Sequence, residues 1–268
     1  MLQEVVSRLP PPLVRAVGRA QFRFPLVRRI VERVTPRLTG SGVITHGLGA
    51  GLRFDAAGGQ PGYLLGTSEP AEQAFLAANL RPGGVFYDVG ANIGFFATLA
   101  ARLVGPSGHV YAFEPFPASA ALVARNAELN GFQNVTVVEA AASDRGGRMP
   151  LAISSSGSQK HRLGTGPGLE VDVVAIDEWA ATSGARRPTV VMIDVEGAEL
   201  QVLAGMHDLL AAQRPVICCE VHWLGEEVLE FHSSTLAPLG YELRQLDGTP
   251  PPPPADRGRW HALLTPHP

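Results

Sequence analysis

Apolar runs of strand length alternate with helical segments along the chain from residue 84 onward. The apolar runs lie at 85–89, 109–114, 135–140, 190–194, 215–221 and 241–245, and the helical segments at 95–104, 119–130, 198–213 and 226–238. Strands that are apolar throughout and separated by helices are typical of a mostly parallel sheet with helices on both faces. A further apolar run at 260–264, after the proline-rich loop 250–254, predicts a last strand. The pattern therefore predicts an α/β fold.

The first part of the chain has a different pattern. Residues 1–42 contain eight arginines, two glutamates and short apolar stripes interrupted by prolines. This predicts a basic helical extension that packs as a cap on the following domain; the alternative is an arm that touches an anionic membrane surface. Residues 43–65 alternate like short strands or a hairpin, and Ser68-Glu69-Pro70 predicts a helix start. We expect one domain over 43–268, with its cofactor-binding half at about 83–145.

Composition excludes some partners and favours one compartment. The net charge of -3 gives no reason to expect nucleic acid as a partner. The chain has no run of about 18 apolar residues. Its two cysteines, Cys218 and Cys219, are adjacent within a predicted strand, so they point to opposite faces and suit buried thiols in a reducing cell interior. We expect a cytoplasmic protein.

The most specific motif is the loop Asp88-Val89-Gly90-Ala91-Asn92-Ile93-Gly94 between a predicted strand and helix. Gly90 and Gly94 permit a tight backbone close to a ligand. The helix start offers free N–H groups to an acidic moiety. A dinucleotide site has a third glycine where this loop has Asn92, and Asp88 would repel a pyrophosphate but accept from an α-ammonium group. The loop therefore favours S-adenosylmethionine as the cofactor.

Two further carboxylates end the next predicted strands. Glu114 ends the run at 109–114 and is placed to bind both hydroxyls of a ribose. Glu139 lies at the end of the run at 135–140 and is placed to accept from an adenine amine, although a glutamate at a strand end needs no ligand. We interpret both as cofactor-binding residues.

A third group of acids follows the strand at 190–193. Asp194, Glu196 and Glu199 lie where this strand runs into a helix. Carboxyl ends of parallel strands face the binding crevice of such sheets, so Asp194 is a candidate to orient the cofactor or the acceptor, or to act as a base. Glu199 has the alternative role of a first-turn residue favoured by the helix dipole.

The strand at 215–221 ends in Glu220 and His222, which share one strand face. A histidine whose pKa is about 6.5 can take a proton from a hydroxyl during methyl transfer. The alternative is a buried histidine under the following helix. We interpret His222, Asp194 and Glu220 as candidate catalytic residues.

Taken together, the segments DVGANIGFF, YAFEP, VEAAASD, IDVEGAE and CCEVH resemble the FkbM family of methyltransferases in order and spacing over about residues 60 to 245. The resemblance implies a Rossmann-like class I fold of seven strands with the last one antiparallel, and S-adenosylmethionine-dependent O-methylation of a natural product, sugar or glycolipid. It also implies two sets of residues. The cofactor set is Asp88, Gly90, Asn92, Gly94, Glu114 and Glu139; the reaction-centre set is Asp194, Glu196, Glu220 and His222.

Some alternatives stay open at this point. A nicotinamide-dependent oxidoreductase and a non-catalytic binding protein both fit the fold, because many functions share it. Asp194 and Glu220 are of the type that binds a divalent metal, but the sequence lacks a full ligand set, and we expect none. The segment 154–168 is either a mobile loop that closes over the acceptor or a solvated linker.

Overall fold

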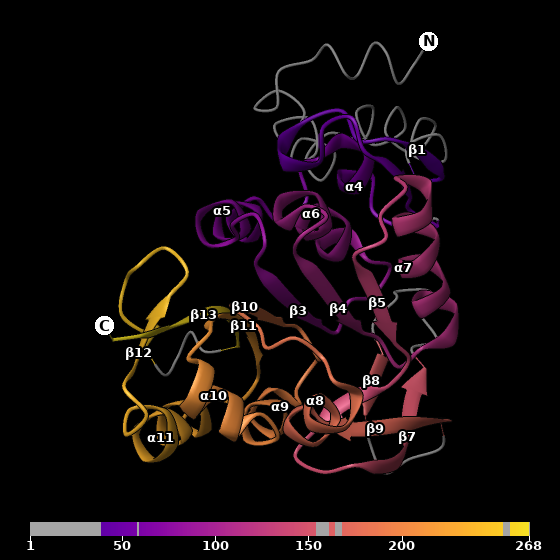
Figure 1. Cartoon of the computed structure of the whole chain (residues 1–268). Coiled ribbons are helices and arrows are strands. Elements are labelled where there is room, and N and C mark those ends of the chain that lie inside the picture. The colour runs from indigo at the N-terminus through magenta and orange to yellow at the C-terminus, as the bar shows by residue number, and fades with distance from the viewer. Residues whose placement is uncertain (1–38, 58, 154–160, 164–167, 254–257, 268) are drawn as a thin grey trace, which may run out of the picture.

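A seven-stranded sheet forms the centre of the computed structural model, which describes residues 39–57, 59–153, 161–163, 168–253 and 258–267 (Figure 1). Its spatial order is β12-β13-β11-β10-β3-β4-β5. The strands are β3 (Val85–Val89), β4 (His109–Phe113), β5 (Val135–Val138), β10 (Val190–Ile193), β11 (Val216–His222), β12 (Tyr241–Gln245) and β13 (Arg259–Pro266). All predicted strands of this sheet are present, and the predicted Rossmann-like fold is confirmed.

Only β13 runs against its neighbours. It pairs antiparallel with β11 on one side and with β12 on the other, whereas β3, β4, β5, β10 and β11 pair in parallel. The antiparallel last strand is thus confirmed. The strand order reverses between β3 and β10, and in such sheets ligands bind at the carboxyl ends beside the reversal.

Helices cover both faces of the sheet, as predicted, and each face has its own core. α5 (Pro70–Asn79), α6 (Phe95–Val104) and α7 (Pro117–Leu129) lie on one face (Figure 1). The other face packs against α8 (Ile176–Ser183), α9 (Glu199–Ala204), α10 (His207–Gln213) and α11 (Glu227–Phe231). Cys218 and Cys219 belong to opposite cores and are both free thiols, as their adjacent positions predicted.

The predicted helix 198–213 is in fact two helices. α9 ends at Ala204 and α10 begins at His207. A side chain at Gly205, between them, would stand 1.9 Å from the carbonyl oxygen of Ser143, so the chain must pass close to a neighbouring strand there. The predicted helix 226–238 is α11 followed by a π-helical turn, His232–Leu236.

A second sheet was not predicted. It has the order β6-β9-β7-β8 and consists of β6 (Ala141–Ser143), β7 (Gly147–Ile153), β8 (His161–Leu163) and β9 (Leu169–Ala175). Its small core contains Leu151, Val171 and Val173. Residues 161–163 of the predicted loop 154–168 form a strand, and the rest of that loop, except residue 168, lies outside the described residues. The signal available in the sequence was the alternation of apolar residues with Glu170 and Asp172 along β9, which matches the burial pattern of the strand.

The segment before α5 is only partly as predicted. β1 (Ser41–Val43) and β2 (Arg53–Asp55) form the expected antiparallel ribbon. A 3-10 turn, Gly47–Gly49, lies between them. The prediction was wrong for residues 63–65, which belong to the short helix α4 (Gly62–Leu65), closed by Gly66 in the left-handed conformation. The domain boundary predicted after residue 42 falls within β1, and residues 1–38 of the predicted extension are outside the described part of the chain.

No helix among the described residues is long and apolar enough to cross a bilayer.

Asn126 of α7 is a buried polar link between three segments. Its Oδ1 accepts from the backbone N–H of Asp55 at 2.7 Å, and its Nδ2 donates to the carbonyls of Ile93 at 2.8 Å and Asp55 at 3.2 Å. The side chain is fully buried. It therefore ties β2 to the loop that follows β3.

We expect Asn126→Ala to lower the free energy of unfolding by about 2–4 kcal/mol, because it leaves buried backbone groups without partners. The matched control is Asn130→Ala, which removes a similar pair of bonds to the backbone of Arg53 at an exposed position and should cost less than about 1 kcal/mol. Urea denaturation followed by circular dichroism measures both, and equal losses would contradict the assignment.

Candidate active site

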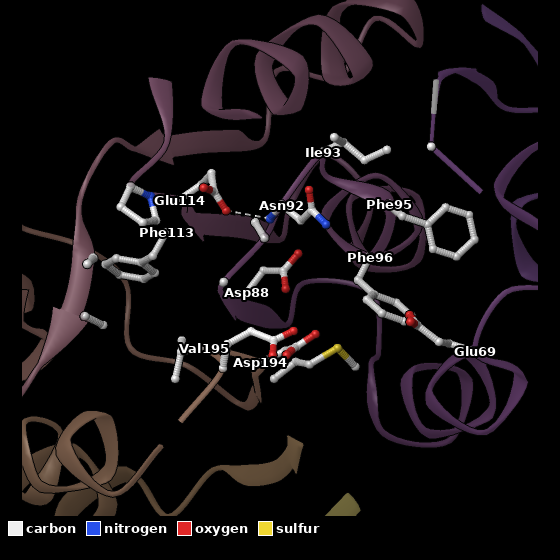
Figure 2. A pocket seen from close by; sticks show the side chains of 18 of the residues that line it. Glu69, Asp88, Asn92, Ile93, Phe95, Phe96, Phe113, Glu114, Asp194 and Val195 are labelled. Atoms are coloured by element: carbon white, nitrogen blue, oxygen red, sulfur yellow. Dashed lines mark hydrogen bonds between the residues drawn. The ribbon is translucent and has the colours of Figure 1, made fainter. Parts of the chain in front are cut away.

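A cavity of about 520 Å³ opens at the carboxyl ends of β3, β4 and β10, beside the reversal of strand order. Figure 2 shows side chains from these three strand ends around one open space. The second sheet closes one side with Leu151 and Leu163. The predicted residues that line the cavity are Asp88, Gly90, Asn92, Glu114, Asp194 and Glu196.

Glu114 is held in place by the backbone on both of its oxygens. The N–H of Asn92 donates to Oε2 at 2.8 Å (dashed in Figure 2), and the N–H of Phe116 donates to Oε1 at 2.9 Å. Burial raises the pKa of Glu114 to about 7, although these two N–H donors act against the rise. Each oxygen keeps a second lone pair, so a fixed carboxylate stands ready for hydroxyl donors in the cavity.

Asp88 lies on the other side of the loop and is also buried. Burial raises its pKa to about 7; a backbone hydrogen bond from Ala97 opposes this, and the charges of Glu114 and Glu69 add to it. Its Oδ2 and the Oδ1 of Asn92 form no hydrogen bond within the described chain. Buried polar atoms without partners are costly, so their presence here points to ligand donors.

The structure gives a different reason for the two loop glycines than close approach to a ligand. A Cβ on Gly90 would lie 1.9 Å from the carbonyl oxygen of Asp194, and one on Gly94 would lie 3.0 Å from the Cα of Val123. Both glycines also have left-handed φ angles, 88° and 80°. They are required because the loop packs tightly on the protein itself.

His222 is the centre of a cluster of four acids, namely Asp194, Glu196, Glu199 and Glu220. Its Nδ1 lies 2.8 Å from Oε1 of Glu199, and both side chains are fully buried. Because the N–H of Gly197 also donates to this oxygen, the oxygen is an acceptor and Nδ1 carries the proton. Nε2, on the other side of the ring, faces the carboxylates of Asp194 and Glu196.

Three carboxylates surround that nitrogen. Nε2 lies 3.6 Å from Glu196, 3.8 Å from Asp194 and 3.9 Å from Glu220. Burial lowers the pKa of His222, but the hydrogen bond with Glu199 and the charges of the acids outweigh it and raise the pKa above its ordinary value. Burial and the neighbouring acids raise the pKa of Asp194 to about 8.

Cationic groups from β13 balance one of these acids. Glu220 accepts a short hydrogen bond from Nε of Arg259, and Nε2 of His261 lies 3.6 Å from Glu220 and 2.7 Å from Glu72 of α5. Burial alone would raise the pKa of Glu220, but Arg259 and His261 lower it. Glu220 therefore keeps its negative charge more readily than Asp194 does.

The structure thus brings the predicted acids and His222 together, except for Glu139, although Glu220 and His222 are not among the residues that line the cavity itself. Glu139 is exposed and does not line the cavity, because β5 ends at Val138 and the chain turns so that Ala140, Ala141 and Ala142 line it instead. Gly94 lies behind the cavity wall, against α7.

Sequence reasoning missed the role of Glu199 and the contributions of Arg259 and Glu69. Glu199 is the partner of His222, and its first-turn position explains its location but not this contact. Arg259 and Glu69 line the cavity from segments outside the recognised motifs. The only signal for them was that β13 and the start of α5 also reach this edge of the sheet.

We expect Gly90→Ala to lower the free energy of unfolding by about 3 kcal/mol or more, because its Cβ must displace the carbonyl of Asp194. Gly184→Ala is the matched control: its φ is 69° in the ordinary left-handed helical region, and no atom lies within 4 Å of the added Cβ. That change should cost about 1 kcal/mol, from backbone strain alone. Urea denaturation compares the two, and similar losses would refute a tight contact between the loops.

Several known methyltransferases are similar to this chain in sequence or structure. A family model described as the methyltransferase FkbM domain matches residues 88–245, more than half of the chain. The hexuronic acid methyltransferase AglP of Haloferax volcanii is 30% identical over 140 residues, 52% of this chain and 56% of that protein. The 31-O-demethyl-FK506 methyltransferase FkbM of Streptomyces tacrolimicus is 34% identical over 176 residues, 53% of this chain and 67% of that protein.

Among solved structures, the methyltransferase FkbM of Methylobacillus flagellatus KT aligns with 90% of this chain and 60% of its own, at 17% identity and a TM-score of 0.47. The alignments therefore span between 56% and 67% of the length of these three proteins. The family match covers the loop after β3, the cluster of acids around His222 and the strands between them. This chain belongs to the methyltransferase FkbM domain family.

Proposed function

We propose that the chain is an S-adenosylmethionine-dependent methyltransferase that acts on a hydroxyl group of a small molecule or a glycan. One observation carries the proposal: buried carboxylates flank the glycine loop in the same cavity that reaches the acid–imidazole cluster. The family membership and the names of the relatives, which act on a hexuronic acid and on an oxygen of a natural product, support it.

The cofactor fits the donor and acceptor groups of the cavity. S-adenosylmethionine supplies a methyl group on a sulfonium, together with an ammonium group and two ribose hydroxyls. Glu114 would accept from the ribose hydroxyls, and the unpartnered Oδ2 of Asp88 would accept from a cationic donor. The loop Gly90–Gly94 would carry the methionine part. The adenine role predicted for Glu139 is not part of the proposal, because this side chain is exposed.

We propose that the acceptor hydroxyl lies beside Asp194, Glu220 and His222. Glu199 fixes the ring of His222 so that Nε2 faces the cluster. As the oxygen attacks the methyl carbon, its proton passes to the cluster, with His222 or Asp194 as the base. Most of the rate enhancement would come from holding the two reactants in line within one cavity.

We also propose that the protein is cytoplasmic. Cys218 and Cys219 are buried free thiols on opposite faces of the sheet, which agrees with a reducing cytoplasm.

We expect S-adenosylhomocysteine to bind in calorimetric titration, and Asp88→Ala and Glu114→Ala each to weaken binding by about 10- to 100-fold, because each removes a charged hydrogen-bond acceptor. Glu139→Ala is the matched control at an exposed strand end and should leave the dissociation constant unchanged. No binding by the folded protein, combined with uptake of a nicotinamide dinucleotide, would overturn the proposal in favour of an oxidoreductase.

Binding should also depend on pH in a defined direction. Asp88 and Glu114 have pKa values of about 7 in the free protein, and the cofactor's donors prefer the ionised carboxylates. Below pH 7 both groups must lose protons before binding, so the dissociation constant should rise by about tenfold or more between pH 7.5 and pH 6. Glu114→Gln removes one titrating group and should flatten the curve; an unchanged curve would contradict this assignment.

A further inference from the structure

The Nε2 atom of His222 has no hydrogen-bond partner within the described chain, although the side chain is 1% exposed. Its orientation is not free, because Glu199 holds Nδ1 from the other side. Oδ1 of Asp194, which is also buried, has no hydrogen-bond partner either. Two unpartnered ligand-type atoms thus face each other at 3.8 Å.

Nε2 faces three carboxylates without a hydrogen-bond partner in the described chain, an arrangement that a bound cation would satisfy. A proton on Nε2 does not satisfy the group, because the distances of 3.6–3.9 Å exceed those of a hydrogen bond. Two ligands at about 2.1 Å from one metal ion lie about 3–4 Å apart at the usual angles. One ligand atom from each of Asp194, Glu220 and His222 lies within 4.8 Å of the other two.

We propose that Asp194, Glu220 and His222 bind a divalent transition-metal ion, of the Mn²⁺ or Zn²⁺ type, at the acceptor end of the cavity. One imidazole and two carboxylates are a donor set suited to such ions. Alkaline-earth ions fit less well, because they prefer oxygen ligands alone. This inference rests on the proposed function only in placing the ion beside the acceptor. It replaces the expectation from the sequence that no metal is bound.

The surroundings of the three ligands support an ion. Glu199 on Nδ1 of His222 forms the carboxylate–histidine pair that orients metal-binding imidazoles. Four carboxylates, of Asp194, Glu196, Glu199 and Glu220, meet only the guanidinium of Arg259 as a permanent positive charge among the described neighbours. A divalent ion would offset this excess of negative charge.

An ion at this position would give His222 the role of a ligand instead of a base. The ion would bind the oxygen of the acceptor and lower the pKa of the acceptor's hydroxyl. The proton would pass to Glu196, which lines the cavity beside the cluster and is not among the three ligands. The oxygen–carbon bond would then form as the carbon–sulfur bond of the cofactor breaks, leaving S-adenosylhomocysteine.

The test is titration of the chelator-treated full chain with MnCl₂, followed by calorimetry and by electron paramagnetic resonance. We expect one site with a dissociation constant in the micromolar range. Asp194→Asn and His222→Gln should each weaken it by at least about tenfold. The spin-echo signal should show one imidazole nitrogen that disappears in His222→Gln. Glu139→Gln, an exposed carboxylate outside the cluster, is the matched control and should bind Mn²⁺ as the unaltered chain does.

Two outcomes would overturn the inference: no binding of Mn²⁺ or Zn²⁺ by the folded chain, or binding that survives both ligand substitutions. Asp194→Asn is nearly isosteric, so thermal unfolding of this variant separates a lost ligand from a lost fold. S-adenosylhomocysteine is titrated in parallel without metal. If S-adenosylhomocysteine binds but Mn²⁺ does not, only the metal site is refuted. If neither binds, the result counts against the proposed function itself.

Discussion

The contact between the loop after β3 and the chain after β10 is the constraint on which the site depends. Gly90 packs so closely on the carbonyl of Asp194 that a side chain has no room, and the N–H of Asp194 donates to Val89 at 2.9 Å. These two segments leave the sheet in its middle, beside the reversal of strand order. The glycine loop after β3 and the acids after β10 are therefore positioned by one shared backbone contact.

Backbone strain and buried charge are concentrated at the same place. Non-glycine residues with left-handed φ angles in the described chain are Ala57, Glu69, Asn92, Glu196, Arg214 and Trp223. Of these, only Arg214 and Trp223 do not line the cavity, and Trp223 directly follows His222. Strained conformations of this kind persist where the surrounding structure holds them, and they gather at functional sites. The buried carboxylates add a second cost, which a bound cationic ligand would remove.

The sequence predicted the parts of the structure that repeat a strong local pattern. β3, β4 and β10 are mostly apolar strands, each is followed by a helix, and each has an acid in it or directly after it. Their positions and the edge at which Asp88, Glu114 and Asp194 meet could therefore be read from the sequence. The contact of Glu199 with His222 could not, because it joins residues 23 positions apart and depends on how α9 packs against β11. Glu139 shows a different limit of prediction from sequence. The strand before it was predicted, but the sequence does not tell which side of the following turn faces the cavity.

The same difference explains why the cofactor is easier to infer than the acceptor. The cofactor half of the cavity is built from one continuous strand–loop–helix unit and the next strand, so its chemistry is encoded within about 30 residues. The acceptor half is assembled from β10, β11, β13 and the second sheet, whose Leu151 and Leu163 line the cavity. No local pattern links these segments, and Arg259 reaches the cluster only because β13 inserts between β11 and β12. In the proposed function, acceptor preference is therefore a property of the tertiary arrangement and not of one local motif.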